Sequence, residues 1–168
     1  MNLKGASINS KRNLVFFYPS LEIGGLTKNL FSLINSLSQK KYGIIFITFN
    51  TINKNKVGSK LYAFDHKIKV VTPNIKIKTN NRYLKYFFCF FLLLKYLYQN
   101  NNLLISFQSN VLAILAAKMM NSKIIIRCNT APSKYISNFI KKFFFKIVFS
   151  KSDKILVTSK DFKLEMKK

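Results

Sequence analysis

Short apolar runs recur along the whole chain, and polar loops or segments of helical periodicity separate them. We predict a strand for each of six runs, at residues 13–18, 44–49, 68–71, 103–107, 123–127 and 154–158. Continuous apolar runs of this length are typical of strands buried on both faces of a sheet. Because strands and helical segments alternate, the pattern predicts an α/β fold with a Rossmann-like, doubly wound parallel sheet.

The segments between these runs predict the helices. After the glycine pair at 24–25, apolar residues recur three and four positions apart, which places them on one helical face. Residues 83–98 are predicted to form a mostly buried helix, and residues 50–60 an exposed loop. Further helices are expected over 111–120, 133–149 and from about 159 onward.

The chain is one domain by length. Its 168 residues suit a single domain, since domains typically run to about 100–150 residues. With 49% hydrophobic residues it is apolar enough to form a core rather than remain disordered. We assign residues 13–168 to the Rossmann-like domain and residues 1–12 to a basic N-terminal extension.

The chain is strongly basic. Its 29 lysines and arginines against 5 acids give a formal charge of +24, which can indicate nucleic acid, an anionic membrane or a phosphorylated ligand. Arginine occurs only at Arg12, Arg82 and Arg127; the lysines accompany many Asn, Ile and Phe residues, all favoured by A/T-rich codons. Part of the charge is therefore compositional. Nucleic acid is disfavoured as a partner, because the aromatic residues fall in core runs and no helix-turn-helix, zinc-finger or RNP-like motif is present.

Cysteine usage and apolar run lengths favour a cytoplasmic chain. Cys89 and Cys128 form neither a C-x-x-C pair nor part of a Cys/His cluster, so a zinc site is not expected. The apolar run before Pro19 is too short for a signal peptide. The longest run, 86–94, falls far short of the ~20 residues that span a bilayer.

Isolated reactive residues have simple structural interpretations. Cys128 has no partner histidine that would activate a thiolate, so we expect it to pack in the interior. His66, the only histidine, lies in a polar stretch and is expected to be solvated. Asp153 is interpreted as a turn or helix-terminal residue rather than a general base.

Gly24 and Gly25 stand between the first predicted strand and its helix. Ligands of such sheets bind outside the carboxyl ends of the strands, and adjacent glycines before a helix let backbone N–H groups approach a phosphate. The loop matches neither G-x-x-x-x-G-K-[ST] nor G-x-G-x-x-G, so ATP hydrolysis and dinucleotide binding lose their usual support. A tight turn without a ligand is the alternative.

The stretch VFFYPSLEIGGLTKNLFSLINSLSQKKYGIIFITFN resembles the opening of the N-terminal domain of retaining GT-B glycosyltransferases of family four. In that family a strand leads through a Gly-Gly loop into the first helix. Residues 105–135 and 151–168 are similar to later parts of the same domain. The second of these is similar to the family's Ala-Asp-x-Ile-Ile-x-x-Ser segment, with Ser152 in place of the alanine. The resemblance implies one half of a GT-B fold.

The resemblance also implies an activity: transfer of a sugar from a nucleotide-sugar donor to a cell-surface glycan or lipid-linked acceptor, in the cleft between two domains. It implies neither a metal nor another cofactor. It places donor phosphates at Gly24, Gly25 and Lys28. It places the acceptor at Ser109, Asn110, Arg127, Asn129, Ser133 and Lys134. The family's paired-glutamate donor motif, E-x7-E, is absent, so we expect the C-terminal donor domain to be missing and the chain alone to be inactive.

The predicted helix at 133–149 suggests an alternative function. Its apolar stripe, at 136, 139, 140, 143, 144, 147 and 148, is expected to face the sheet. This leaves on its outer surface Lys141, Lys142, Phe145, Lys146 and Phe149. Aromatic residues among lysines suit a helix lying in an anionic membrane surface. A non-catalytic basic module at the inner face of the cell membrane is therefore the alternative, and a solvated lysine edge is the simpler interpretation.

Overall fold

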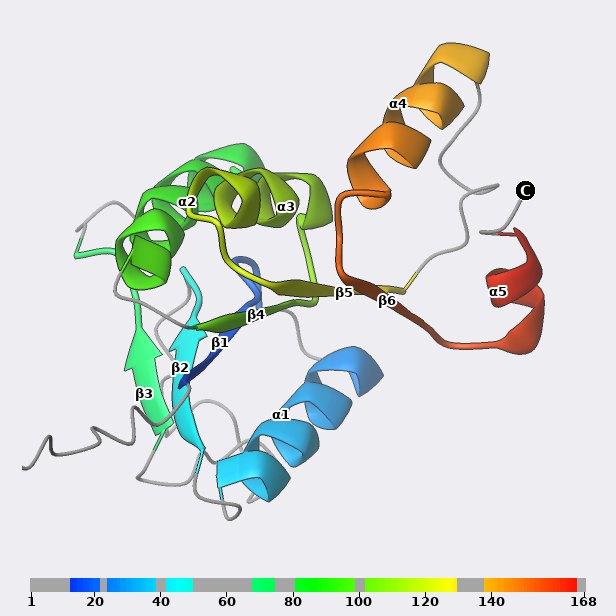
Figure 1. The fold of residues 1–168 in the computed structure, drawn as a ribbon. Coiled ribbons are helices and arrows are strands. Elements are labelled where there is room, and N and C mark those ends of the chain that lie inside the picture. The colour runs from blue at the N-terminus through cyan, green and yellow to red at the C-terminus, as the bar shows by residue number, and fades with distance from the viewer. Residues whose placement is uncertain are drawn as a thin grey trace, which may run out of the picture.

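The computed structural model describes residues 13–21, 24–38, 42–49, 68–74, 81–98, 102–129 and 138–165, in which strands and helices alternate (Figure 1). The strands are β1 (Asn13–Phe17), β2 (Gly43–Ile47), β3 (Ile68–Val71), β4 (Leu103–Ser106), β5 (Ile124–Cys128) and β6 (Lys154–Val157). The helices are α1 (Gly25–Ser38), α2 (Arg82–Tyr98), α3 (Asn110–Met119), α4 (Phe139–Phe149) and α5 (Lys160–Glu165). The predicted extension 1–12 and loop 50–60 lie outside the described residues.

The described strands form one sheet in the order β3-β2-β1-β4-β5-β6, and every neighbouring pair is parallel. This is the strand order of a Rossmann-like, doubly wound sheet, so the predicted fold class is confirmed. The order reverses between β1 and β4. Phe17 pairs with both Ile47 and Ser106, which brings the carboxyl ends of β1, β2 and β4 to the same edge.

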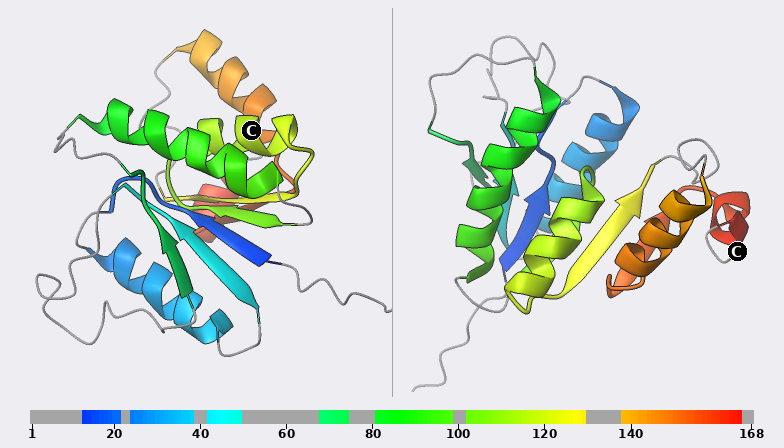
Figure 2. Two further views of the ribbon diagram at one scale, coloured as in Figure 1. Left: turned by 90° about the vertical axis from the view of Figure 1, so that its left-hand side faces the viewer. Right: turned by 90° about the horizontal axis from the view of Figure 1, so that it is seen from above.

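Helices cover both faces of the sheet. Helix α1 lies on one face, whereas α2, α3 and α4 lie on the other (Figure 2). Alternate residues of β1 serve the two cores: Leu14 and Phe16 pack with α1, and Val15 and Phe17 pack on the α2 and α3 side. Both sets are buried, which is why the strand reads as an uninterrupted apolar run.

Helix α2 is not mostly buried, so that prediction was wrong. Cys89, Leu93 and Leu97, spaced four residues apart, are buried in the core. The opposite side of the helix exposes Phe87 and Phe91. A helix that lies on the surface of a sheet buries one stripe only, and apolar residues in the remaining positions stay in solvent.

The predicted orientation of α4 was also wrong. Phe149 is only 7% exposed and packs in the core together with half-buried Phe145, the two residues expected on the outer surface. The outer face instead carries most of the stripe that was expected to face the sheet: Phe139, Ile140, Phe143, Phe144 and Ile147. The helix is apolar on nearly every side, so spacing alone could not select the buried face. It is also shorter than predicted, since Asn138 before it is extended.

Candidate functional site at the carboxyl edge of the sheet

Hydrogen bonds join the loops that follow β1, β4 and β5. The backbone N–H of Ser20, after β1, donates to Oε1 of Gln108, after β4, at 2.9 Å. Nδ2 of Asn129, after β5, donates to the carbonyl of Phe107 at 2.9 Å. These three segments therefore form one continuous rim at the carboxyl edge, next to the point where the strand order reverses.

Asn110, the first residue of α3, holds this rim together. Its Oδ1 accepts a hydrogen bond from Oγ of Ser106 at 2.8 Å, and its Nδ2 donates to the carbonyl of Arg127 at 3.0 Å. Nδ2 also lies 3.8 Å from Sγ of Cys128. The side chain of Asn110 thus bridges the ends of β4 and β5 through both of its amide atoms, which makes it a positioning residue.

A cavity of about 700 Å³ opens at this rim. Among the residues that line it are four of the six predicted acceptor residues: Ser109, Asn110, Arg127 and Asn129. The other two, at 133 and 134, lie outside the described residues. Ser133 and Lys134 therefore stay predictions.

The amino end of α2 also lines the cavity, with Arg82, Tyr83 and Tyr86, none of which the sequence analysis placed in a site. These residues follow β3 in the chain, but they lie at the start of α2, well beyond the end of the strand, so a search directly after each strand did not reach them. The scarcity of arginine was the available signal.

The cavity is electropositive. Arg127 is half-buried, and its guanidinium carbon lies 5.2 Å from the centroid of the Phe107 ring, a cation–π contact that holds the side chain against the β4 loop. Arg82 adds a second guanidinium. Among the described lining residues there is no aspartate or glutamate.

Cys128 and Asp153 have the structural roles predicted for them. Burial raises the pKa of the Cys128 thiol to about 11, although the Asn110 side chain partly offsets this, so the thiol is neutral at pH 7. Asp153 Oδ2 accepts a hydrogen bond from the Ile124 N–H at 2.7 Å, which ties the turn before β6 to the start of β5. His66 lies outside the described residues.

The glycine loop is open. Gly24 and Gly25 are exposed, neither has a positive φ, and a Cβ placed on either would meet no atom within 4 Å. Nothing in the described fold therefore requires glycine at these positions. Lys28 is exposed in the first turn of α1. The Ser20–Gln108 hydrogen bond connects this loop to the wall of the cavity, but donor binding here stays a prediction.

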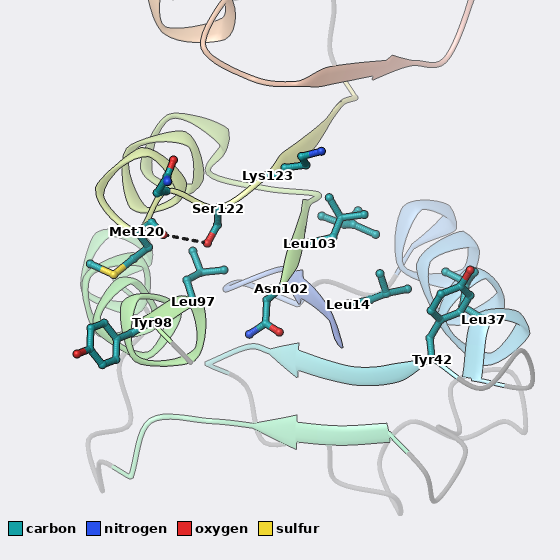
Figure 3. Close-up of a pocket in the computed structure, with 12 residues that line it drawn as sticks. Leu14, Leu37, Tyr42, Leu97, Tyr98, Asn102, Leu103, Met120, Ser122 and Lys123 are labelled. Carbon is teal, nitrogen blue, oxygen red and sulfur yellow. Dashed lines mark hydrogen bonds between the residues drawn. The ribbon is translucent and has the colours of Figure 1, made fainter. Parts of the chain in front are cut away.

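A second cavity, of about 670 Å³, lies at the opposite, amino edge of the sheet (Figure 3). It is lined largely by aliphatic and tyrosine side chains, including Leu14, Tyr42 and Leu103, and by none of the predicted site residues. Its polar lining residues include Asn102, Asn121, Ser122 and Lys123. Nδ2 of Asn102 donates to the Tyr96 carbonyl at 2.6 Å, while its buried Oδ1 has no hydrogen-bond partner.

Within the described ranges, no group of three or more His, Cys, Asp or Glu side chains is arranged to hold a metal ion. No helix in that same part of the chain is both long and apolar enough to cross a bilayer. Comparison of the sequence with protein-family models gives no match, and no curated protein matches it either.

Proposed function

We propose that the chain is the acceptor-side half of a retaining GT-B glycosyltransferase, which transfers a sugar from a nucleotide-sugar donor to a cell-surface glycan or lipid-linked acceptor. One observation supports this most: Ser109 and Asn110, at the start of α3, and Arg127 and Asn129, at the end of β5, all of which the resemblance assigns to the acceptor, line one cavity. Ligand sites of Rossmann-like sheets lie at this edge.

In this proposal the glycine loop binds the donor phosphates, and the loops after β4 and β5 bind the acceptor. As the sugar leaves the donor, negative charge develops on the diphosphate, and backbone N–H groups and cations stabilise it. Gly24 and Gly25 offer open backbone for that contact. Lys28 supplies charge in the first turn of α1, where a cation opposes the helix dipole and does not favour the helix by itself. Ser109 and Asn129 present a hydroxyl and an amide that can bind acceptor hydroxyl groups.

Nucleotide binding tests the donor loop. Titration of the chain with uridine diphosphate and with uridine, followed by NMR, is expected to show binding that requires the diphosphate. Lys28→Gln should weaken it severalfold, whereas Lys118→Gln, a matched change at an exposed lysine of α3, should not. Equal binding of uridine and its diphosphate would remove the support for this loop.

Turnover tests the half-enzyme proposal separately. We expect negligible sugar transfer when the 168-residue chain is incubated with radiolabelled nucleotide sugars and a lipid extract as acceptor. Transfer above the level of a protein-free control would contradict the need for a second domain.

A second candidate function is peripheral binding to the inner face of the cell membrane from the cytoplasm. It is supported by the outer face of α4, where Phe139 is 82% exposed and Ile140 is 80% exposed. The same helix carries Lys141, Lys142 and Lys146, all exposed. Apolar side chains flanked by lysines combine insertion with attraction to anionic lipid, about 1 kcal/mol per basic residue near the surface.

Flotation with anionic vesicles tests this candidate. The double variant Phe143→Ser/Phe144→Ser changes side chains that are 59% and 51% exposed on α4. Its matched control is Phe87→Ser/Phe91→Ser on α2, where the exposed fractions are 55% and 54%. We expect only the α4 variant to lose vesicle binding. Binding that survives in the α4 variant but vanishes in high salt would indicate charge adsorption without insertion.

A further inference from the structure

Arginine is distributed unevenly over this chain. The sequence has 26 lysines and three arginines, yet two of the three, Arg82 and Arg127, line the same cavity. The described residues of that cavity include no lysine. If its positive charge merely reflected a lysine-rich composition, lysines would be expected there. The presence of arginine rather than lysine in this cavity therefore calls for an explanation specific to the cavity.

Arg82 is not placed where a helix dipole favours a cation. It is the first residue of α2, where a positive charge opposes the helix dipole, and the first turn of this helix has no acidic residue. Its side chain is exposed and comes to the cavity from the helical layer. Arg127 comes from the end of β5 and is held by Phe107 and by the bond from Asn110 to its carbonyl. Two separate elements thus bring guanidinium groups to one cavity.

We propose that this cavity binds a phosphate group, with Arg82 and Arg127 as its binding residues. A guanidinium donates two parallel hydrogen bonds to a pair of anionic oxygens, which an ammonium cannot do. A carboxylate has two oxygens in one plane, and one such fork engages both of them. A phosphate presents oxygens in several directions and can accept from two guanidinium groups that arrive from different elements.

This inference deepens the proposed function and rests on it: the acceptor is a phosphate-bearing molecule. The phosphate can belong to a lipid headgroup or to a soluble phosphorylated sugar or polyol. Phe145 and Phe149, on the inner side of α4, line the same cavity, while the outer side of that helix is the exposed apolar face described above. The cavity and that apolar face therefore share one helix.

Titration with sn-glycerol 3-phosphate at low ionic strength, followed by NMR, tests the proposal. We expect Arg82→Lys and Arg127→Lys each to weaken binding about tenfold, because the charge remains but the fork is lost. Lys123→Gln, which removes a charge at the amino edge, should change binding by less than about twofold. Acetate should bind at least tenfold more weakly than the phosphate. Unchanged binding in both arginine variants, or equal binding of acetate, would overturn the proposal.

Vesicles containing phosphatidic acid distinguish the two sources of phosphate. If the arginine variants lose affinity for both the vesicles and glycerol 3-phosphate, the ligand is a lipid headgroup. If they lose affinity for glycerol 3-phosphate alone, the ligand is a soluble phosphorylated molecule. Thermal unfolding verifies that Arg127→Lys still folds, and exposed Arg82 provides the variant least able to disturb the core. The two proposals can fail separately. If uridine diphosphate binding depends on Lys28 but glycerol 3-phosphate binding is unchanged in both arginine variants, this inference is overturned and the proposed function is not.

Discussion

The two edges of the sheet carry cavities of similar volume, about 700 Å³ at the carboxyl edge and about 670 Å³ at the amino edge, but they differ in chemistry. At the carboxyl edge, side-chain amides bridge three loops and two arginines face one space. At the amino edge, aliphatic and tyrosine side chains make up most of the lining, Lys123 is its one cation among the described residues, and Asn102 has an unpartnered oxygen. Cavity size therefore does not identify the site. The direction of the strands does, because a parallel sheet brings the loop after every strand to one edge.

The largest expected effect is the difference in thiol reactivity between the folded and the unfolded chain. Burial raises the pKa of Cys128 to about 11 and that of Cys89 to about 12, from an ordinary value of 9.0. Each thiol then has at least about a hundredfold less reactive thiolate at pH 8 than in the unfolded chain. We expect Ellman's reagent to react at least that much more slowly with native protein than in denaturant. Cys128, which lines the carboxyl-edge cavity, should react before Cys89. Rapid modification of both thiols in the native protein would contradict their burial.

The same pKa shifts give stability a pH dependence. The folded chain keeps the thiol protons at pH values where the unfolded chain releases them, so this contribution to stability is complete below about pH 9 and lost as the pH rises toward 11. Urea unfolding should therefore show a steeper decline over this range in wild type than in Cys128→Ala. Identical slopes would mean that the thiol is not protected in the fold.

Two asparagines allow a direct comparison of the edges. Asn110 is bonded through both of its amide atoms, so Asn110→Ala should lower the free energy of unfolding by about 2 kcal/mol. Asn102→Ala loses one bond but also removes the unpartnered buried oxygen, and should cost about 1 kcal/mol or less. Chemical denaturation measures both. A larger loss at Asn102 would mean that the amino edge is the more tightly organised one.

Gly25→Ala is expected to have the smallest effect on stability. Because Gly25 lies in α1 and the added Cβ meets no atom within 4 Å, the variant should be as stable as wild type or about 0.5 kcal/mol more stable. Binding of uridine diphosphate should nevertheless weaken, since the methyl group lies where the phosphates would approach. Destabilisation beyond about 1 kcal/mol, measured by urea unfolding, would show that the fold itself requires this glycine.

Much of the fold was predictable because each strand is an apolar run with clear ends. β1 ends before Pro19 and β2 starts at Gly43, and the predicted ends of both strands lie within two residues of the observed ones. The buried face of α4 was not predictable, because Phe145 and Phe149 are chemically equivalent to Phe143 and Phe144; only packing against the sheet distinguishes them. Four of the acceptor residues that line the cavity came from the resemblance, whereas Arg82 lies at the start of α2, well beyond the end of β3, and reaches the cavity through the position of that helix over the sheet.

Mapping ligand-induced NMR shifts onto the two edges tests the central claim most directly. On titration with uridine diphosphate and sn-glycerol 3-phosphate, we expect the largest backbone amide shifts at Gly24, Gly25, Ser109, Asn110 and Arg127. Amides of the amino edge, such as Leu14, Asn102 and Lys123, should remain within the noise. Shifts concentrated at the amino edge, with the carboxyl edge unmoved by either compound, would contradict the account.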